Sequence, residues 1–215
     1  VLALLYGWHV RRSPALRQAW HSVFYTPSAV ACAVVLGFFV FVGLLDSIHY
    51  RPVLPALEHQ TETRYSPIAR SVLDDVLEVA GMAKKERSYS APLSTRLFFK
   101  ESMLFEGQVK RDFPALENAA LNVSTPEEHR QQLGRLALWA LFWVAVVTLG
   151  VGGLCRAGAK RHAGFPWKSL WLSLSLLLAT LITIYIFSRF YYLLGTDRSG
   201  NDVLYQCFKS IRTAL

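Results

Sequence analysis

Three long apolar runs without a charged residue constrain this chain more than any other feature. They cover residues 28–45, 136–154 and 170–188. A helix needs roughly twenty mostly apolar residues to cross the hydrocarbon core of a bilayer. With 53% hydrophobic residues in 215, the chain is also too apolar for a typical soluble domain of its size. The sequence therefore predicts an all-α membrane protein with transmembrane helices at 28–45, 135–154 and 170–188.

Basic residues before the first apolar run predict its orientation. Arg11, Arg12 and Arg17 lie in the segment 1–27, and such residues beside a membrane helix favour the cytoplasmic side. A cleaved signal peptide is the alternative, because it also has a basic region ahead of an apolar one. The apolar run is long for a signal, however, and no small-residue cleavage site follows Leu45. We therefore expect an uncleaved anchor with a cytoplasmic N-terminus.

A second basic group lies between the second and third apolar runs. It comprises Arg156, Lys160, Arg161, His162 and Lys168. This density of positive charge predicts that the loop 155–169 is cytoplasmic. From a cytoplasmic start, three crossings place the C-terminal segment 189–215 on the outside of the membrane.

The polar segment 46–134, between the first and second runs, is predicted to form an exported helical domain. Its charges nearly balance, so it has little net field with which to attract a charged substrate. A first helix opens at Ser66 and Pro67 and ends at Gly81. Its expected apolar stripe consists of Ile68, Val72, Val76 and Val79.

Two more helices are expected in this segment, and a fourth leads back to the membrane. Apolar spacing predicts a helix over 92–105 and a shorter one over 114–122. Thr125 and Glu128 have the spacing of a capping box, with proline at the first helical position between them. The helix that they start should enter the membrane near Leu136.

The segment 194–215 combines a polar turn with an amphipathic helix. Ser199 and Asp202 have capping-box spacing, which predicts a helix from about Gly200 onward. The expected apolar stripe is Leu204, Phe208, Ile211 and Leu215, with Lys209 and Arg212 off that stripe. Such a helix lies flat on a bilayer or packs under a bundle.

This C-terminal segment, LGTDRSGNDVLYQCFKSIRTAL, resembles the start of the permease domain in dipeptide, oligopeptide and nickel ABC importers, whose pattern is close to LGTDxxGxDVLxRxxxGxRxSL. The matching positions are Leu194, Gly195, Thr196, Asp197, Gly200, Asp202, Val203, Leu204, Arg212 and Leu215. Gln206 stands where Arg is usual, Ser210 where Gly is usual, and Thr213 stands between Arg212 and the expected Ser. The resemblance covers about a tenth of the chain. Asp46 and Pro52, after the first apolar run, give a weaker similarity to the same family's first helix.

The resemblance implies the N-terminal part of a permease subunit in a bacterial inner membrane, importing peptides or a related small solute, nickel complexes included. The chain begins at Val1 and stops at Leu215 inside a helical pattern, so we expect it to be a piece of a longer protein. The implied partners are a second permease subunit, two ATP-binding subunits and a periplasmic solute-binding protein. ATP would be bound by those partner subunits, and no cofactor is expected in this chain.

Six motif residues are the candidate site, namely Gly195, Thr196, Asp197, Gly200, Asp202 and Arg212. Short carboxylates in such positions cap turns and helix starts more often than they bind ligands, so a structural role is expected. Hydroxyls in the third apolar run (Ser173, Ser175, Thr180 and Thr183) are expected to bond the preceding turn of their own helix.

Other classes of function find less support. The sequence has no GxSxG, no Walker motif and no paired His and Cys, so we do not expect an enzyme. His59 and His129 lack metal-ligand spacing. The net charge of +8 comes from dispersed residues or residues beside apolar runs, which favours membrane orientation over nucleic-acid binding. The alternative function is a stand-alone membrane-anchored scaffold whose exported helical domain binds a partner protein.

Overall fold

The chain is mostly helical, and three of its helices are long and apolar enough to cross a membrane. The computed structural model describes residues 7–10, 12–53, 64–105, 108–117, 125–162 and 164–214. The three long helices are α3 (Pro27–Ser47), α5 (Pro126–Arg161) and α6 (Trp167–Ser188). They contain the three predicted spans, so the prediction of three helices long and apolar enough to cross a membrane is confirmed.

The chain forms two compact units, each built from two separate stretches of sequence. Unit 1 contains residues 1–38 and 142–181, and unit 2 contains residues 39–141 and 182–215. Helices α3, α5 and α6 each contribute residues to both units. Unit 1 is mainly helical, and unit 2 contains both helices and strands.

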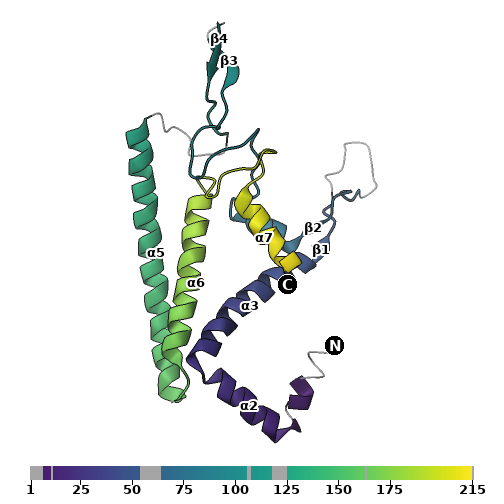
Figure 1. The fold of residues 1–215 in the computed structure, drawn as a ribbon, viewed down its shortest axis with the longest axis vertical. Helices are drawn as coiled ribbons and strands as arrows, with labels where there is room; N and C mark the ends of the chain where they lie inside the picture. Colours follow the sequence, from purple (N-terminus) through teal and green to yellow (C-terminus); the bar gives the residue numbers. More distant parts are fainter. Residues whose placement is uncertain are drawn as a thin grey trace. The chain divides into compact units, whose positions relative to one another are not determined.

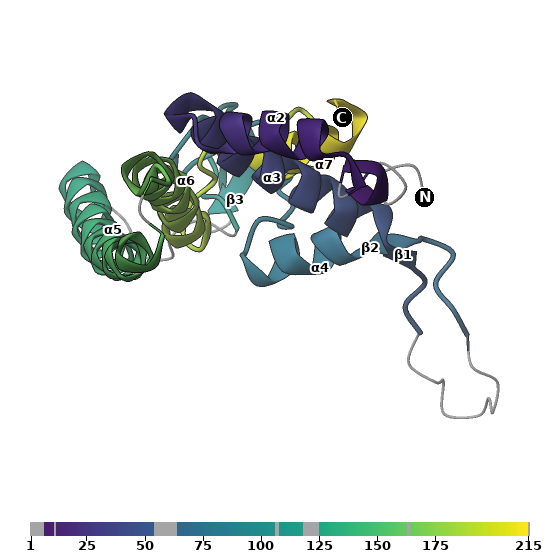
Figure 2. The same cartoon turned by 90° about the horizontal axis from the view of Figure 1, so that it is seen from below.

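Unit 1 is helical throughout its regular structure. Helix α2 (Pro14–Phe24) begins with proline at its first position and buries none of its residues. No helix was predicted within the segment 1–27. The last part of α5 and the first part of α6 run antiparallel and side by side (Figures 1 and 2). The Ser169 hydroxyl donates to the backbone oxygen of Pro27 at 2.5 Å, which ties the start of α6 to the start of α3.

Unit 2 adds two short helices and two small sheets to the ends of the long helices. The helices are α4 (Val72–Val79) and α7 (Val203–Ala214). Strand β1 (His49–Tyr50) pairs antiparallel with β2 (Arg70–Ser71), and β3 (Glu101–Phe105) pairs antiparallel with β4 (Gln108–Asp112). The β3–β4 hairpin projects from the rest of the unit (Figure 1). The expected all-α class is therefore corrected to a mostly helical fold with two two-stranded sheets among the described residues.

The capping box predicted at the start of α5 is confirmed. The Thr125 amide donates to Glu128 Oε2 at 3.2 Å, and the Glu128 amide donates to Thr125 Oγ1 at 3.3 Å. The helix then continues past its predicted end at Leu154 and stops at Arg161. Glycine weakens a helix interior by only about 1 kcal/mol, and aromatic rings on α6 pack against two of the glycines in this stretch.

Helix α4 starts later than predicted and buries a different face. It is capped by Ser71, whose hydroxyl accepts from the Asp74 amide at 3.2 Å while the Ser71 amide donates to Asp74 Oδ2 at 2.8 Å. Moving the start from Ser66 to Val72 turns the buried side to Leu73 and Leu77, each 3% exposed. The predicted stripe is exposed at Ile68, Val76 and Val79. Its predicted end at Gly81 holds, since the Gly81 amide donates to the backbone oxygen of Glu78 and its φ is +81°.

The helix predicted over 92–105 is wrong. Leu93 has a φ of +54°, and Leu97 donates its amide to the backbone oxygen of Pro114 at 2.9 Å, so the chain passes through turns, bends and isolated bridges before β3. The backbone partners of this stretch come from distant segments, and they outweigh its local helical spacing. Of the helix predicted over 114–122, residues 114–117 are not helical and the rest lies outside the described residues. Among the described residues of 46–134, the predicted helices are therefore found only at α4 and at the start of α5.

Two buried clusters form the core of unit 2. One joins Leu97, Leu116 and Tyr192, and the other joins Leu136, Ala140, Ile186 and Tyr191. Tyr191 and Tyr192 lie shortly after the end of α6, and each belongs to one of the two clusters. The chain just before the motif segment is therefore buried against both α5 and the residues Leu97 and Leu116.

Candidate functional site

The motif segment forms a turn that binds a second segment, residues 86–92. Thr196 is fully buried; its hydroxyl donates to the backbone oxygen of Ser88 at 2.8 Å and accepts from the Ser90 amide at 2.8 Å. The Thr196 amide donates to the backbone oxygen of Ser90 at 3.2 Å. The Tyr192 hydroxyl donates to Glu86 Oε1 at 3.1 Å. Thr196 therefore supplies the hydrogen-bond partners that the backbone groups of Ser88 and Ser90 would otherwise lack.

Two motif glycines allow this close approach. Gly195 and Gly200 both have a φ of +77°, a backbone conformation that favours glycine. A Cβ on Gly195 would lie 2.3 Å from the backbone oxygen of Ser90, and one on Gly200 would lie 1.8 Å from that of Glu86. Any larger residue would have to push the motif turn off the segment 86–92.

The two motif aspartates hold the turn and the helix start. Asp197 accepts from the Asn201 amide at 2.8 Å through Oδ1, and Asp202 accepts from the Leu204 amide at 2.8 Å through Oδ1. Helix α7 begins at Val203, so Asp202 is its cap, and the predicted cap at Ser199 is wrong. The left-handed Gly200 prevents helical geometry between Ser199 and Asp202.

Asp202 is the most buried ionisable group of the motif, with 3% of its surface exposed. Burial raises the pKa of its carboxyl from 3.8 to about 6, against the opposing effect of the Leu204 and Tyr205 amides and the Lys84 ammonium. Lys84 itself donates to the backbone oxygen of Arg189 at 3.0 Å. Its pKa is lowered by burial and by the neighbouring Arg189 guanidinium.

Helix α7 brings Lys209 between two carboxylates from elsewhere in unit 2. The ammonium lies 2.5 Å from Asp46 Oδ1 at the end of α3 and 2.9 Å from Asp74 Oδ1 in α4. The Ser71 hydroxyl donates to Asp46 Oδ1 at 2.9 Å, and the Tyr205 hydroxyl donates to Asp74 Oδ1 at 2.6 Å. We call Asp46, Ser71, Asp74, Tyr205 and Lys209 the ion cluster.

The ion cluster shifts the titration of its members in opposite directions. Burial alone would raise the pKa of Asp74, but the Ser71 amide, the Tyr205 hydroxyl and Lys209 hold that pKa well below its ordinary value. Burial lowers the pKa of Lys209, and its two carboxylate partners outweigh this and raise it. Burial and the Asp74 carboxylate raise the pKa of Tyr205. Each shift stabilises the charge state in which the cluster is fully paired.

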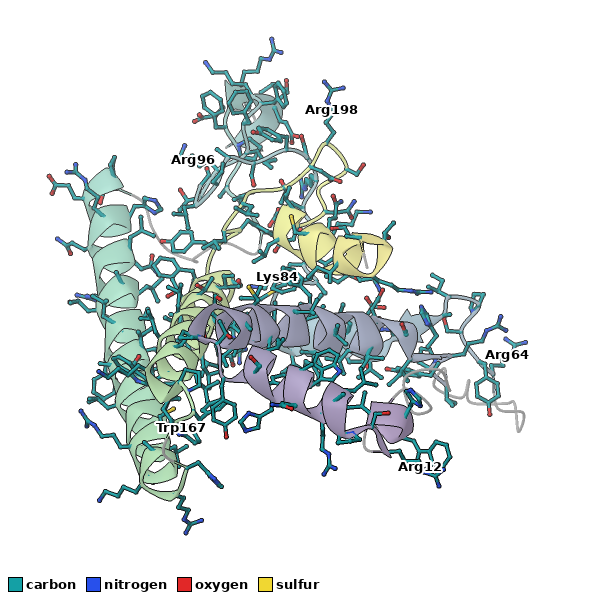
Figure 3. The ribbon with its side chains drawn as sticks, turned by 60° about the horizontal axis from the view of Figure 1, so that its bottom comes forward. Arg12, Arg64, Lys84, Arg96, Trp167 and Arg198 are labelled. Carbon is teal, nitrogen blue, oxygen red and sulfur yellow. The ribbon has the colours of Figure 1, made fainter. Side chains whose placement is uncertain are left out.

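Arg212, the last candidate residue, lies at the edge of this cluster. Its Nη1 is 3.9 Å from Asp46 Oδ2 and 3.4 Å from His49 Nε2, and about half of its side chain is exposed. The departure at Gln206 has a simple local effect, because its Nε2 donates to Asp197 Oδ2 at 2.8 Å. The turn therefore keeps a donor at the position where Arg is usual, without the charge. Arg198 is exposed and points away from the turn (Figure 3).

The turn was predicted from the sequence, whereas the ion cluster was not. Lys209 was predicted to lie off the apolar stripe, and it is half-buried against Asp46 and Asp74. A signal did exist in the sequence, since Tyr205 and Lys209 are four residues apart and share one helix face. Their partners lie more than a hundred residues earlier, where no local spacing could identify them.

Other candidate residues lie apart from the motif turn. His129 Nδ1 is 3.2 Å from the Tyr191 hydroxyl, and His59 lies outside the described residues. Ser173 and Thr180 donate to the backbone oxygens of Ser169 and Leu176, four residues earlier, which confirms that expectation for these two. The Ser175 hydroxyl is buried without a hydrogen-bond partner among the described residues, so the expectation is wrong for Ser175.

Every one of the six candidate residues contacts other parts of the protein itself. The turn binds segment 86–92 through Gly195, Thr196 and Gly200, while Asp202 caps α7 and the ion cluster fixes its far side. This geometry positions helix α7. No protein-family model, curated protein or solved structure matches the chain.

Proposed function

We propose that this chain is the N-terminal part of an ABC importer permease subunit in a bacterial inner membrane. Its cargo would be peptides or a related small solute. The observation that carries the proposal is the motif from Leu194 to Leu215, in which ten positions agree with the importer pattern in one fixed register. In this role the chain hydrolyses nothing, and partner subunits bind ATP.

The contacts of the motif support this proposal because each contact explains why a particular residue type occupies its position in the pattern. Gly195 and Gly200 are demanded by close backbone contacts, Thr196 by the buried backbone that it satisfies, and Asp202 by the start of α7. A pattern that arose by chance would not be expected to coincide with such contacts at so many positions. In the proposed role, the turn and the ion cluster hold α7 at a defined angle, so that the permease core follows in register.

The arrangement of charges and spans also favours the proposal. From a cytoplasmic start, three crossings place the motif outside, the side on which the importer family carries the resembling stretch. The usual arrangement reaches the motif after one crossing, and an added pair of spans leaves the side unchanged. The basic loop 155–169 then lies in the cytoplasm, as the positive-inside rule requires.

Copurification of the intact protein tests the proposal. The tagged protein, expressed at its native level and extracted in a mild detergent, should bring with it a second permease subunit and ATP-binding subunits that mass spectrometry identifies by their Walker motifs. The complex should hydrolyse ATP. Recovery of the protein only as a free monomer would contradict the proposal and favour the membrane-anchored scaffold.

A pair of variants connects this test to the motif turn. Gly200→Val places a side chain where the Glu86 backbone oxygen already lies, and should abolish recovery of the ATP-binding subunits. Ser199→Ala changes an exposed side chain in the same turn and should leave recovery unchanged. Equal recovery with both variants would show that assembly does not depend on the turn.

A further inference from the structure

A pocket of about 530 Å³ lies at the joined ends of α5 and α6, within unit 1. Leu149, Gly152 and Arg156 line it from α5, and Lys168, Trp171 and Leu172 line it from α6. Its volume falls within the range of small-molecule sites. The pocket combines an apolar wall with two cationic side chains.

Two tryptophans shape this pocket, and glycines fix their positions. Trp171 Nε1 donates to the backbone oxygen of Thr148 at 3.1 Å, and Trp167 Nε1 donates to that of His162 at 3.2 Å. A Cβ on Gly152 would lie 3.1 Å from Trp171 Nε1. A Cβ on Gly158 would lie 2.3 Å from the Trp167 ring. The rings therefore pack directly on the α5 backbone, and Trp167 lies at the joined ends of the two helices (Figure 3).

The cations of the pocket have no anionic partner within unit 1. The sequence of this unit contains no Asp or Glu, and its basic residues are Arg11, Arg12, Arg17, Arg156, Lys160, Arg161 and Lys168. Arg156 and Lys168 are exposed, and neither forms an ion pair with a described residue. An anion from outside the unit would complete the site.

The apolar wall selects the kind of anion. Leu149 and Leu172 are 74% and 65% exposed, at the end of spans that a bilayer would surround. A soluble anion could contact the cations but could not also fill the apolar wall beside them. A phospholipid supplies both a phosphate and an acyl chain, and tryptophan is enriched at the depth where those two parts meet. Basic pockets between membrane helices bind anionic headgroups by the same chemistry.

We propose that this pocket binds an anionic phospholipid of the surrounding bilayer. Arg156 and Lys168 contact its phosphate, Trp171 lies beside the glycerol region, and Leu149 and Leu172 contact an acyl chain. The inference is independent of the transport function proposed above, since it requires only that α5 and α6 span a membrane.

Quenching of tryptophan fluorescence by brominated lipids tests the proposal on the full chain in an uncharged detergent. Brominated phosphatidylglycerol should bind about 25-fold more tightly than brominated phosphatidylcholine, since attraction to anionic lipid contributes about fivefold per basic side chain. Trp171→Phe should remove a large part of the quenching. Millimolar inorganic phosphate should not displace the lipid; displacement would identify a phosphate site and overturn the lipid assignment.

Matched charge variants separate a built site from diffuse attraction. Arg156→Gln with Lys168→Gln should remove the preference for phosphatidylglycerol. Lys160→Gln with Arg161→Gln removes the same charge from the same basic stretch, outside the pocket lining, and should keep most of it. Equal losses in both pairs would overturn the proposal. Leu172→Trp leaves the charges in place and fills the apolar part, so it should weaken binding of both lipids; unchanged binding would also overturn the proposal.

Discussion

At the scale of single residues, the motif turn shows how burial changes the chemistry of one carboxyl group. Asp202 and Asp197 are five residues apart and both accept backbone amides. Asp202 is buried, and its pKa is raised to about 6. Asp197 is more exposed, and the hydrogen bonds from Asn201 and Gln206 lower its pKa. The pKa values of two aspartates in one turn are therefore shifted in opposite directions.

Asp202 should make the stability of the protein fall as pH rises between about 4 and 6. With a folded pKa of about 6 and an ordinary value of 3.8, the folded state binds more protons than the unfolded state in this range, so ionisation costs about 2 to 3 kcal/mol. Asp202→Asn keeps a good helix cap and should abolish this decline. Thermal unfolding followed by circular dichroism from pH 4.5 to 7.5 measures it.

Asp197→Asn is the control, because the lowered pKa of Asp197 stabilises the fold above its ordinary pKa and that contribution is lost as pH falls. This variant should be less stable than the wild type at pH 7, and Asp202→Asn should be more stable. If Asp202→Asn retains the wild-type pH profile, Asp202 is not the group responsible.

At the scale of elements, local patterns predicted the long helices well and the short ones poorly. The spans and the α5 capping box follow from composition and three-residue spacing, which a sequence displays directly. The stretch 92–105 has helical spacing of Leu93, Leu97 and Leu104, yet Leu97 is buried through pairing with the region of Pro114. The ion cluster likewise joins residues that are distant in sequence. When distant residues stabilise an element, the spacing of its own apolar residues does not predict its structure.

The ion cluster should contribute most of the stability of α7 docking. Lys209→Met leaves two poorly exposed carboxylates facing each other, 5% and 14% exposed, and should destabilise unit 2 by about 3 kcal/mol. Arg212→Met removes a half-exposed cation 3.9 Å from Asp46 and should cost less than about 1 kcal/mol. Chemical unfolding of both variants gives the comparison.

Replacing Asp46 by Asn in the Lys209→Met background should recover part of the lost stability, because it removes one of the unpaired charges. Equal effects of Lys209→Met and Arg212→Met would instead mean that solvent screens both cations alike, and that the cluster does not fix α7.

At the scale of the whole molecule, each compact unit is assembled from separate stretches of chain. The motif segment completes unit 2 by binding residues 86–92, although more than a hundred residues separate them. The segment 46–134 therefore lacks its own closing partner. The segment predicted as a helical domain therefore forms one compact unit together with residues 182–215.

Cysteine labelling tests the predicted topology of the whole chain. Cys207 is exposed on α7, whereas Cys155 is 8% exposed and Cys32 lies within the apolar α3. In cells with a permeable outer membrane, a membrane-impermeant maleimide should modify Cys207 and spare the other two. Ala157→Cys, at an exposed position in the basic stretch, should react only after the inner membrane is opened.

Cys207→Ser provides the control by removing the outer signal. Labelling of Cys155 or of Ala157→Cys before Cys207 would place the basic loop outside, against the positive-inside rule, and would remove the topological support for a permease.

The two glycines of the motif turn have a consequence for any library of this gene. At Gly195 and Gly200 both the backbone conformation and the neighbouring oxygen exclude a side chain, so selection for folded protein should leave a single permitted amino acid at each. Ser199 and Arg198, exposed between them, should accept nearly all. A saturation screen would thus return two invariant glycines with two tolerant positions directly before the second, a signature by which distant relatives of this turn can be recognised.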